Sequence, residues 1–447
     1  MPSVRSRIRR PAPVSETLRQ LGDRVRQARI DAGLSQAQLG APHFTRAYVS
    51  AIELGKVRPA MKSLEFLADK LNKPVSFFVE DTEADRRRRE RISQVARANQ
   101  LVAEGTSREA IDLLEPLLAT TNIPSERADL QRALGRALRE AGMNGPAVAA
   151  LSEAVQILRA VGDREQLARA RGELGACLVQ LMSYGEAEAE LEQALVAISK
   201  GDLTDPVAKV HVVYNLGLCS YGRGDFKTAL ELFQRAEREG SDIGDPKWLG
   251  SLFAAMGMSR HETGDYESAV TYLLRSETLF ESIHNRVRAA EIKFQTARAL
   301  RALGHKSKSA EAFEDALVAA RSAGNTQLSI RIATALALGM AEDGEFAMAV
   351  ARAEQVVDDA DRSGDDALRS VARFALGRVL RKVDIARAEL VLRESVAIID
   401  KLPTDSLFAE VFGELSEVLA ENGVSDEALA YSRRAYQATK QRKEVSR

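Results

Sequence analysis

The chain has 447 residues, more than one hydrophobic core usually serves, so it is expected to fold as several units. Hydrophobic residues make up 45% of the chain and charged residues 28%, as in soluble folded proteins. Aromatic residues make up only 5%, and this low content favours packed helices over strands. The net charge of −1 hides an asymmetry. Residues 1–80 hold 14 Lys and Arg against 7 Asp and Glu, whereas the remainder holds 49 against 57. A basic first part followed by an acidic remainder indicates nucleic-acid contact by the first part alone.

Several function classes are not expected from this sequence. No apolar run approaches the roughly 18 residues of a membrane span, and the basic start at Met1–Arg10 lacks the apolar stretch of a secretory signal. The two cysteines, Cys177 and Cys219, have neither disulfide-scaffold nor zinc-site spacing, which fits a reducing cytoplasm. There is no phosphate loop, nucleophile elbow or dinucleotide fingerprint, so neither an enzyme nor a bound cofactor or metal is predicted.

The first predicted helix spans about residues 15–32, where apolar residues recur at helical spacing, and Gly33 ends it. Ser35 is expected to cap a short second helix, and a turn follows at residues 41–43. Thr45 is the predicted N-cap of a third helix that runs from Arg46 to about Leu54.

Gly55 is expected to close the third helix, and Ser63 is expected to cap a fourth. Residues 74–78 form a fifth short turn, with Phe77 and Phe78 filling a small core. The other core positions predicted here are Leu39, Val49, Ile52, Leu64 and Leu67.

Four short motifs carry a family resemblance: Leu34-Ser35-Gln36, Val49-Ser50-Ala51-Ile52-Glu53, Gly55-Lys56 and Pro59. With this spacing, residues 18–79 resemble the lambda-repressor/Cro-like (XRE) helix-turn-helix family. One departure is that Pro42-His43-Phe44 fills a turn one residue shorter than the family's usual turn. The resemblance implies a DNA-binding domain, which we place at residues 15–80.

The third helix is the predicted reader of double-stranded DNA, because the major groove admits one helix whose N-terminal residues reach base edges. Arg46 is suited to guanine, while Gln36 and Lys56 match family positions that meet phosphates. Glu53 is expected to be a charge partner within the domain. Alternatives remain: Tyr48 as a simple surface residue, and a helix-turn-helix that no longer binds DNA. The predicted DNA-contacting residues are Gln36, Thr45, Arg46, Ala47, Tyr48, Ser50 and Lys56.

Two basic stretches flank this domain. Residues 1–14 carry Arg5, Arg7, Arg9 and Arg10, which form either an arm that reaches DNA or a disordered tail. Residues 81–92 are predicted to be a linker helix, whose arginines lie on a solvated face.

Residues 93–443 repeat with a period of about 40 residues, which predicts a helical array. Pairs such as Leu134-Gly135, Leu174-Gly175, Leu216-Gly217 and Met256-Gly257 recur, and each is followed by a small and then a large apolar residue. This pattern is that of the tetratricopeptide (TPR) family. The whole chain is therefore predicted to be all-α, with a five-helix domain followed by a right-handed superhelix of about nine TPRs. Glycines between repeats, at positions 162, 244, 324 and 364, are expected to be helix C-caps.

In the TPR pattern the first helix of each repeat lines a concave groove. The resemblance makes Asn215 a candidate to bond a peptide backbone, and the many arginines suit carboxylates. The alternative is that these arginines pair with Glu and Asp on adjacent helices. Arg132, Arg136, Arg139, Arg378 and Arg381 also fall on this inward side. The predicted ligand-binding residues are Arg169, His211, Tyr214, Asn215, Leu218, Tyr221, Met258, His261, Phe294, Gln295, Arg298, Arg301 and Arg331.

An XRE domain followed by 40-residue TPRs resembles the peptide-pheromone regulators of Gram-positive bacteria known as RRNPP. That resemblance implies a cytoplasmic homodimer that takes part in quorum sensing and whose groove binds a short signalling peptide. The functional hypothesis is a ligand-gated transcription regulator. Two alternatives are open: a TPR scaffold or adaptor for a protein partner, with a secondary or vestigial DNA-binding domain, and a regulator that responds to a small molecule or to no ligand.

Overall fold

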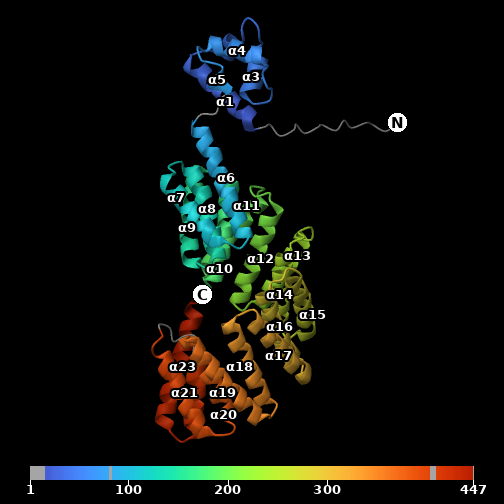
Figure 1. The fold of residues 1–447 in the computed structure, drawn as a ribbon, viewed down its shortest axis with the longest axis vertical. Helices are drawn as coiled ribbons and strands as arrows, with labels where there is room; N and C mark the ends of the chain where they lie inside the picture. Colours follow the sequence, from blue (N-terminus) through green and yellow to red (C-terminus); the bar gives the residue numbers. More distant parts are fainter. Residues whose placement is uncertain (1–15, 80–82, 403–408, 446–447) are drawn as a thin grey trace, which may run out of the picture. The chain divides into compact units, whose positions relative to one another are not determined.

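The computed structural model describes residues 16–79, 83–402 and 409–445, so the predicted arm at residues 1–14 lies outside it. The chain divides into two compact units, Met1–Ala96 and Arg97–Arg447 (Figure 1). All regular elements in the described ranges are α-helices, which confirms the all-α prediction. A bilayer crossing would need a longer apolar stretch than any of these described helices offers. We call α1–α5 the head and the helices from α6 (Glu83–Ala103) onward the array; the boundary between the two units falls within α6.

Side-chain caps begin the second and third helices of the head, as predicted. The Ser35 hydroxyl accepts a hydrogen bond from the backbone N–H of Gln38 at 3.2 Å, and the Gln38 side-chain oxygen accepts one from the Ser35 N–H at 2.8 Å. The Thr45 hydroxyl accepts from the backbone N–H of Tyr48 at 3.2 Å. These bonds satisfy N–H groups that a helix leaves without an internal partner.

Two details of the head differ from the prediction. The fourth helix begins at Met61, with Ala60 as its cap, because Pro59 and the extended Ala60 lead directly into the helix. Ser63 is therefore buried inside the helix and does not cap it. Phe78 is 1% exposed and fills the core, but Phe77 is 40% exposed, since neighbouring positions of a helix face different directions.

The head has one hydrophobic core, in which Leu39, Val49 and Ile52 are fully buried. They pack with Val25 and Leu67, so that α1, α2, α3 and α4 share this core. The predicted core positions in the head are confirmed, with Phe77 as the exception. The head helices are α1 (Glu16–Asp31), α2 (Gln36–Gly40), α3 (Arg46–Glu53), α4 (Met61–Lys70) and α5 (Ser76–Val79).

The array consists of helical hairpins in chain order, as the repeat pattern predicted. Its first helix, α6, runs from Glu83 to Ala103, so the predicted linker helix and the first helix of the first repeat are one continuous helix. The hairpins within the described residues are α6 with α7 (Ser107–Thr120), α8 (Pro124–Glu140) with α9 (Asn144–Val161), α10 (Arg164–Gln180) with α11 (Tyr184–Ser199), α12 (Pro206–Gly222) with α13 (Phe226–Glu239), α14 (Pro246–Glu262) with α15 (Tyr266–Ser282), α16 (Arg286–Ala302) with α17 (Lys306–Ser322), α18 (Thr326–Glu342) with α19 (Phe346–Ser363), α20 (Asp366–Leu380) with α21 (Ile385–Ile399), and α22 (Ala409–Glu421) with α23 (Ser425–Val445).

In several hairpins a glycine on the first helix makes room for a large side chain on the second helix. A Cβ added to Gly217 would lie 2.5 Å from Cε1 of Phe233, and one added to Gly175 would lie 2.5 Å from Cγ of Leu191. Gly135 faces Leu151 in the same way. The small and large residues that recur in the sequence therefore pack against each other inside these hairpins.

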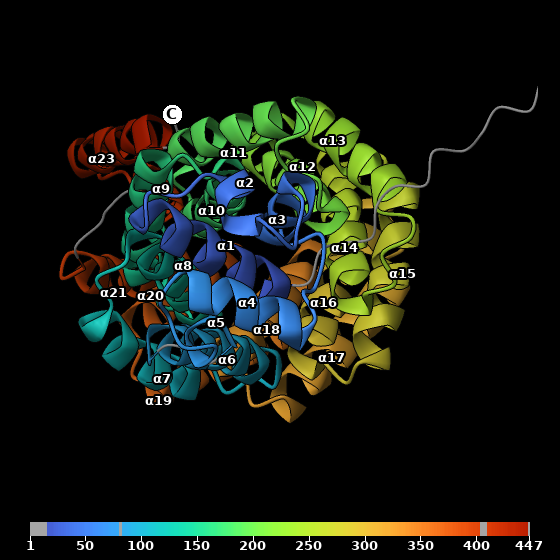
Figure 2. The ribbon, with the colours of Figure 1, turned by 90° about the horizontal axis from the view of Figure 1, so that it is seen from above.

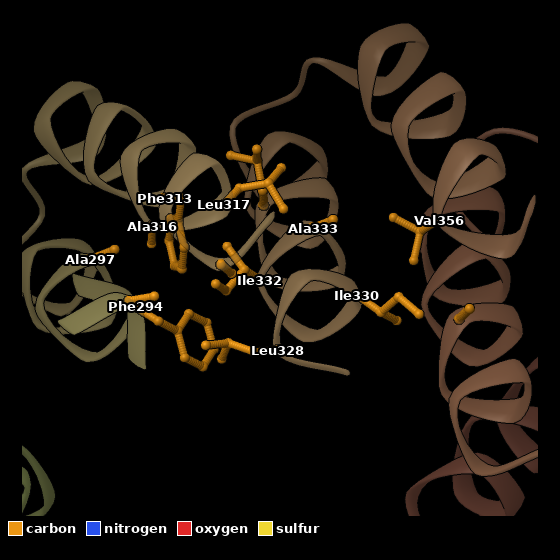
Figure 3. Packing of buried hydrophobic residues seen from close by; sticks show 14 of the residues in the cluster. Phe294, Ala297, Phe313, Ala316, Leu317, Leu328, Ile330, Ile332, Ala333 and Val356 are labelled. Carbon is orange, nitrogen blue, oxygen red and sulfur yellow. The ribbon is translucent and has the colours of Figure 1, made fainter. Parts of the chain in front are cut away.

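Neighbouring hairpins share their hydrophobic cores. Figure 3 shows one such core, where Phe294 from α16 and Phe313 from α17 meet Leu328 and Ile332 from α18. The two rings lie 5.9 Å apart between centroids. Because each hairpin covers the apolar face of the next, the array is one continuous structure rather than a string of separate units.

The first helices of successive hairpins lie on the inner side of a curved path. Seen from above in Figure 2, α12, α14 and α16 lie inside α13, α15 and α17. The inward side of these first helices is therefore the concave surface predicted from the repeat pattern.

The turns between helices follow the predicted chemistry except at Gly244. Asp225 follows Gly224, whose φ is +82°, and its side chain caps α13 by accepting from the N–H of Thr228. Gly162 and Gly364 are C-caps with positive φ, as predicted. Gly244 does not cap α13, because that helix already ends at Glu239 with Gly240 as its C-cap.

Candidate nucleic-acid interface and ligand groove

The N-terminal turn of α3 presents polar side chains to solvent. Thr45, Arg46 and Ala47 are exposed, whereas Ser50 and Tyr48, which follow them, are half-buried. Lys56, just after α3, is exposed as well. The surface predicted to meet DNA therefore carries two accessible cations, Arg46 and Lys56.

Two further cations in this region were missed in the sequence analysis. Arg58 and Lys62 are exposed between the end of α3 and the first turn of α4. Their position directly after the Gly55-Lys56 motif is the signal that would have included them. They extend the positive charge beyond the predicted residues.

Aromatic contacts hold the shortened turn before α3. The Phe66 ring of α4 lies 5.5 Å from the Phe44 ring and 4.9 Å from the His43 ring. Phe44 in turn lies 5.0 Å from Tyr48, which explains why Tyr48 is only half-exposed. Lys70 donates from Nζ to the carbonyl of Gln38 at 2.6 Å and to that of Ala41. The turn is thus fixed from α4 although it has one residue fewer than usual.

The amide of Gln36 faces Glu53 within the head. Its Nε2 donates to Oε2 of Glu53 at 2.8 Å, and Arg29 donates from Nε to Oε1 of the same carboxylate at 2.5 Å. The hydrogen bond that Arg29 donates to Glu53 raises the pKa of Arg29. Glu53 is therefore an internal charge partner, as predicted, and it also engages the Gln36 side chain expected to meet phosphate.

A cavity of about 270 Å³ lies on the inner side of α8, α10 and α12. It brings together Arg169, His211 and Asn215 from the predicted ligand set. Arg136 and Arg139 also line it, and both had been placed on the inward side from sequence. Its remaining lining residues are Ala168, Gly172, Glu173, Ala176, Leu203, Asp205, Val207, Ala208 and Val212.

Several inward arginines pair with carboxylates of neighbouring helices, which is the alternative left open from sequence. Arg132 donates from Nε to Oε2 of Glu173 at 3.0 Å. Arg169 donates to Asp205 at 2.5 Å and to Glu165 at 3.0 Å. Arg381 pairs with three glutamates of α22, which raises its pKa.

Asn215 and His211 are one helical turn apart on α12. The Nδ2 of Asn215 donates to the carbonyl oxygen of His211 at 2.8 Å, and Asn215 is buried. His211 is exposed to solvent, yet the pocket wall around its ring disfavours the charged form and lowers its pKa. The positive charge of Arg139 acts in the same direction. His211 is accordingly neutral at pH 7.

Other predicted groove residues lie in the hydrophobic packing. Phe294 is 6% exposed and belongs to the core of Figure 3, so it does not line an open surface. Tyr214 packs 5.7 Å from Phe233, and burial raises its pKa to about 12. Leu218 and Tyr221 pack against the same core. The sequence pattern predicts these large apolar residues as groove lining, but contacts within and between hairpins cover them.

The remaining predicted residues lie further along the array. Arg301 donates to the carbonyl of Gly339 at 2.7 Å and lines a separate cavity of about 400 Å³ between α16, α17 and α18. Arg298 bonds Gln295 on its own helix, and Arg331 lies 5.7 Å above the Phe294 ring. The Nδ1 atom of His261 lies 3.3 Å from Oε1 of Glu262, and Met258 is half-buried. The predicted ligand-binding residues therefore do not form one site: some line one of two cavities, and the others lie elsewhere on the helices of the array.

Comparison with known proteins agrees with this architecture. Residues 25–78 match the family model HTH_3, described as Helix-turn-helix. No curated protein matches the sequence significantly. The apo quorum sensor NprR from B. thuringiensis is 13% identical, with a TM-score of 0.49, over 94% of this chain and 97% of that one. A Rap protein complexed with Competence and Sporulation Factor is 11% identical, with a TM-score of 0.53, over 80% and 99%.

A third solved structure is also similar to this chain. The STAND protein with a tetratricopeptide repeat sensor from Pyrococcus horikoshii is 14% identical, with a TM-score of 0.54, over 86% of this chain and 57% of that one. The Rap and STAND structures, with TM-scores of 0.53 and 0.54, share the fold of this chain, and at these identities the likeness extends to the fold alone. Residues 25–78 are thus a helix-turn-helix domain of the XRE type, and the array that follows has the TPR-like fold.

Proposed function

We propose that this protein is a sequence-specific DNA-binding transcription regulator whose array senses a ligand, and that the ligand is a short signalling peptide. The observation that carries the DNA-binding part is the exposed N-terminal turn of α3, with Arg46 at its centre. In a helix-turn-helix domain this turn enters the major groove, where an arginine can donate two hydrogen bonds to guanine.

The charge distribution supports the same assignment. The exposed cations Lys56, Arg58 and Lys62 follow α3, where they are suited to phosphates, which orient a domain on DNA without reading sequence. One short helix reads only a half-site, so we propose a cytoplasmic homodimer that binds an inverted repeat.

The concave side of the array is the proposed sensor. A Rap protein of the same fold was solved in complex with Competence and Sporulation Factor, and we extend ligand binding by such an array to this chain. The cavity between α8, α10 and α12 supports this extension, because it gathers charged and polar side chains beside small apolar ones.

A DNA titration tests the proposal. The full chain is titrated into a labelled pool of random DNA duplexes, and fluorescence anisotropy is followed for wild type and for the Arg46→Gln, Lys56→Gln double variant. We expect salt-sensitive binding that the double variant weakens severalfold, while a Lys308→Gln, Lys382→Gln control in the array binds like wild type. Equal binding by all three proteins contradicts the proposed surface. No binding by wild type at moderate salt favours the protein-scaffold alternative.

A further inference from the structure

The cavity between α8, α10 and α12 contains two arginines whose hydrogen-bonding capacity is incompletely used. Arg136 donates from Nη2 to Oδ1 of Asn99 at 2.8 Å, and its Nη1 lies 3.8 Å from Glu173. Arg139 donates from Nη2 to Glu140 at 3.0 Å. The Nε of each arginine is buried without a hydrogen-bond acceptor. A buried N–H of a charged group without an acceptor is costly, so both positions favour an incoming anion.

The third arginine of the cavity is already neutralised. Arg169 is held by Glu165 and Asp205, so it is less available to a ligand than Arg136 and Arg139. Burial lowers the pKa of Arg136, and its arginine neighbours lower it further, while Glu173 opposes them. Among the arginines of the cavity, it is therefore the positive charge of Arg136, rather than that of Arg169, that lacks a balancing negative charge.

The charge of the cavity selects the kind of anion. Its three arginines face two carboxylates, Glu173 and Asp205, and His211 is neutral, which leaves one net positive charge in the lining. Glu140, which does not line the cavity, is shared between Arg139 at 3.0 Å and Lys247 at 3.6 Å. A monoanion balances this charge, whereas a dianionic phosphate would leave an excess of negative charge in a partly buried site. The apolar wall suits an attached alkyl group.

The same geometry connects the cavity to α6. A carboxylate binds an arginine side-on through Nε–H and Nη2–H together. On Arg136 this edge has a free Nε and an Nη2 bonded to Asn99 of α6. A carboxylate that takes both positions displaces Asn99. Loss of this hydrogen bond would free Asn99 on α6, the helix that begins at Glu83.

We propose that this cavity binds a monocarboxylate through Arg136 and Arg139, and that the bound carboxylate competes with Asn99 for Arg136. The carboxylate belongs either to the C-terminus of a peptide or to a free small acid. This proposal rests on the proposed function only where it identifies the bound carboxylate as the ligand that the array senses. Binding is measured without DNA, so a failure here is distinguishable from a failure of DNA binding.

Calorimetric titration of the full chain tests the proposal with three probes: propionate, N-acetyl-alanyl-leucine with a free carboxylate, and its C-terminal amide. The sole tryptophan, Trp248, lies 6.5 Å from the His211 ring between centroids, so its fluorescence gives a second readout. We expect saturable binding of the free carboxylates and none of the amide. Tighter binding of the dipeptide than of propionate identifies a peptide terminus, and equal affinity identifies a free acid. Absence of saturable binding by both acids overturns the proposal.

Variants test the residues. Arg136→Gln and Arg139→Gln should each weaken carboxylate binding about tenfold or more, because each removes a charge-assisted contact. Arg164→Gln is the matched control on α10, where the Arg164 side chain is 79% exposed outside the cavity, and it should bind like wild type. Unchanged affinity in both cavity variants overturns the site.

The competition with Asn99 has its own test. Asn99→Ala removes the competing acceptor, so it should tighten carboxylate binding severalfold. A gain in affinity cannot result from misfolding, which keeps the test decisive even if an arginine variant proves unstable. Unchanged or weaker binding by Asn99→Ala overturns the connection to α6.

Discussion

Glu53, at the end of α3, accepts hydrogen bonds from two other helices of the head. Arg29 of α1 donates to its Oε1 at 2.5 Å and Gln36 of α2 donates to its Oε2 at 2.8 Å. The Glu53 side chain is only 3% exposed. One buried carboxylate therefore fixes the orientation of α3, the helix proposed to read DNA, relative to α1 and α2.

Replacing this carboxylate should destabilise the head. Glu53→Ala leaves the Arg29 charge largely buried without its partner, which should cost about 3 kcal/mol. Hydrogen exchange of the amides in residues 25–78, measured in the full chain, reports this loss separately from the array. Glu65→Ala, at an exposed position of α4, is the control. Equal protection in both variants would show that the Glu53 contacts do not stabilise the head.

Arg46 should contribute to sequence discrimination. Because Arg46 is exposed in the first turn of α3, Arg46→Ala should cost about 1–3 kcal/mol on the preferred DNA site and relax selectivity at one base pair. Competition between the preferred site and its single-base variants measures this effect. If affinity falls equally for specific and random DNA, Arg46 does not read a base.

Lys56 should contribute to affinity without selectivity. Lys56→Ala removes an exposed charge that is suited to a phosphate, so it should weaken all sequences alike. The slope of the logarithm of the DNA association constant against the logarithm of the salt concentration should become shallower by about one, because about one fewer counterion is released. A change in the preferred sequence, with the slope unaltered, would assign Lys56 a different role.

The repeated glycines should be intolerant of a methyl group only where they face a large side chain. Gly217→Ala places Cβ against Phe233 and should cost about 1–3 kcal/mol. The added Cβ of Gly413→Ala in α22 meets no atom within 4 Å among the described residues outside its own turn of helix, and the substitution should stabilise the helix by about 0.5–1 kcal/mol. Thermal unfolding followed by circular dichroism compares the two. A lower midpoint for Gly413→Ala than for Gly217→Ala would refute the packing argument.

Both thiols should be unreactive in the folded chain. Cys177 and Cys219 are buried, and burial raises their pKa to about 11 and about 12. At pH 8 each is therefore a protonated thiol, while thiolate is the reactive form. A thiol-reactive dye should label neither residue until denaturant is added, when both should react. Rapid labelling of the native protein would contradict their burial.

Much of the fold could be predicted because it depends on local chemistry. Ser35 and Thr45 cap their helices by accepting a hydrogen bond from a backbone N–H three residues later, which is a local interaction. The packing of a glycine against a large side chain, as between Gly217 and Phe233, recurs at a fixed spacing in the sequence. Ser63 was misassigned because the extended conformation after Pro59 starts α4 earlier than a capping residue alone would suggest.

The groove was predicted less completely than the fold. Repeat periodicity places Arg136 and Arg169 on the inward side, but it does not say which acceptor each one meets. Those acceptors lie outside the helix of the arginine, 36 residues away for Arg169 with the Asp205 carboxylate and 37 for Arg136 with the Asn99 amide. Phe294 could not be separated from the lining residues, because its burial depends on α17 and α18 packing over it.

DNA recognition is tested most directly by selection of DNA with the purified full chain from a random duplex pool, followed by binding of the enriched sequence across a salt series. We expect an enriched inverted repeat, with affinity that falls steeply as salt rises because each half-site contributes phosphate contacts. No enrichment, with weak or absent binding at every salt concentration, would contradict a DNA-binding regulator and leave the array as the functional part of the protein.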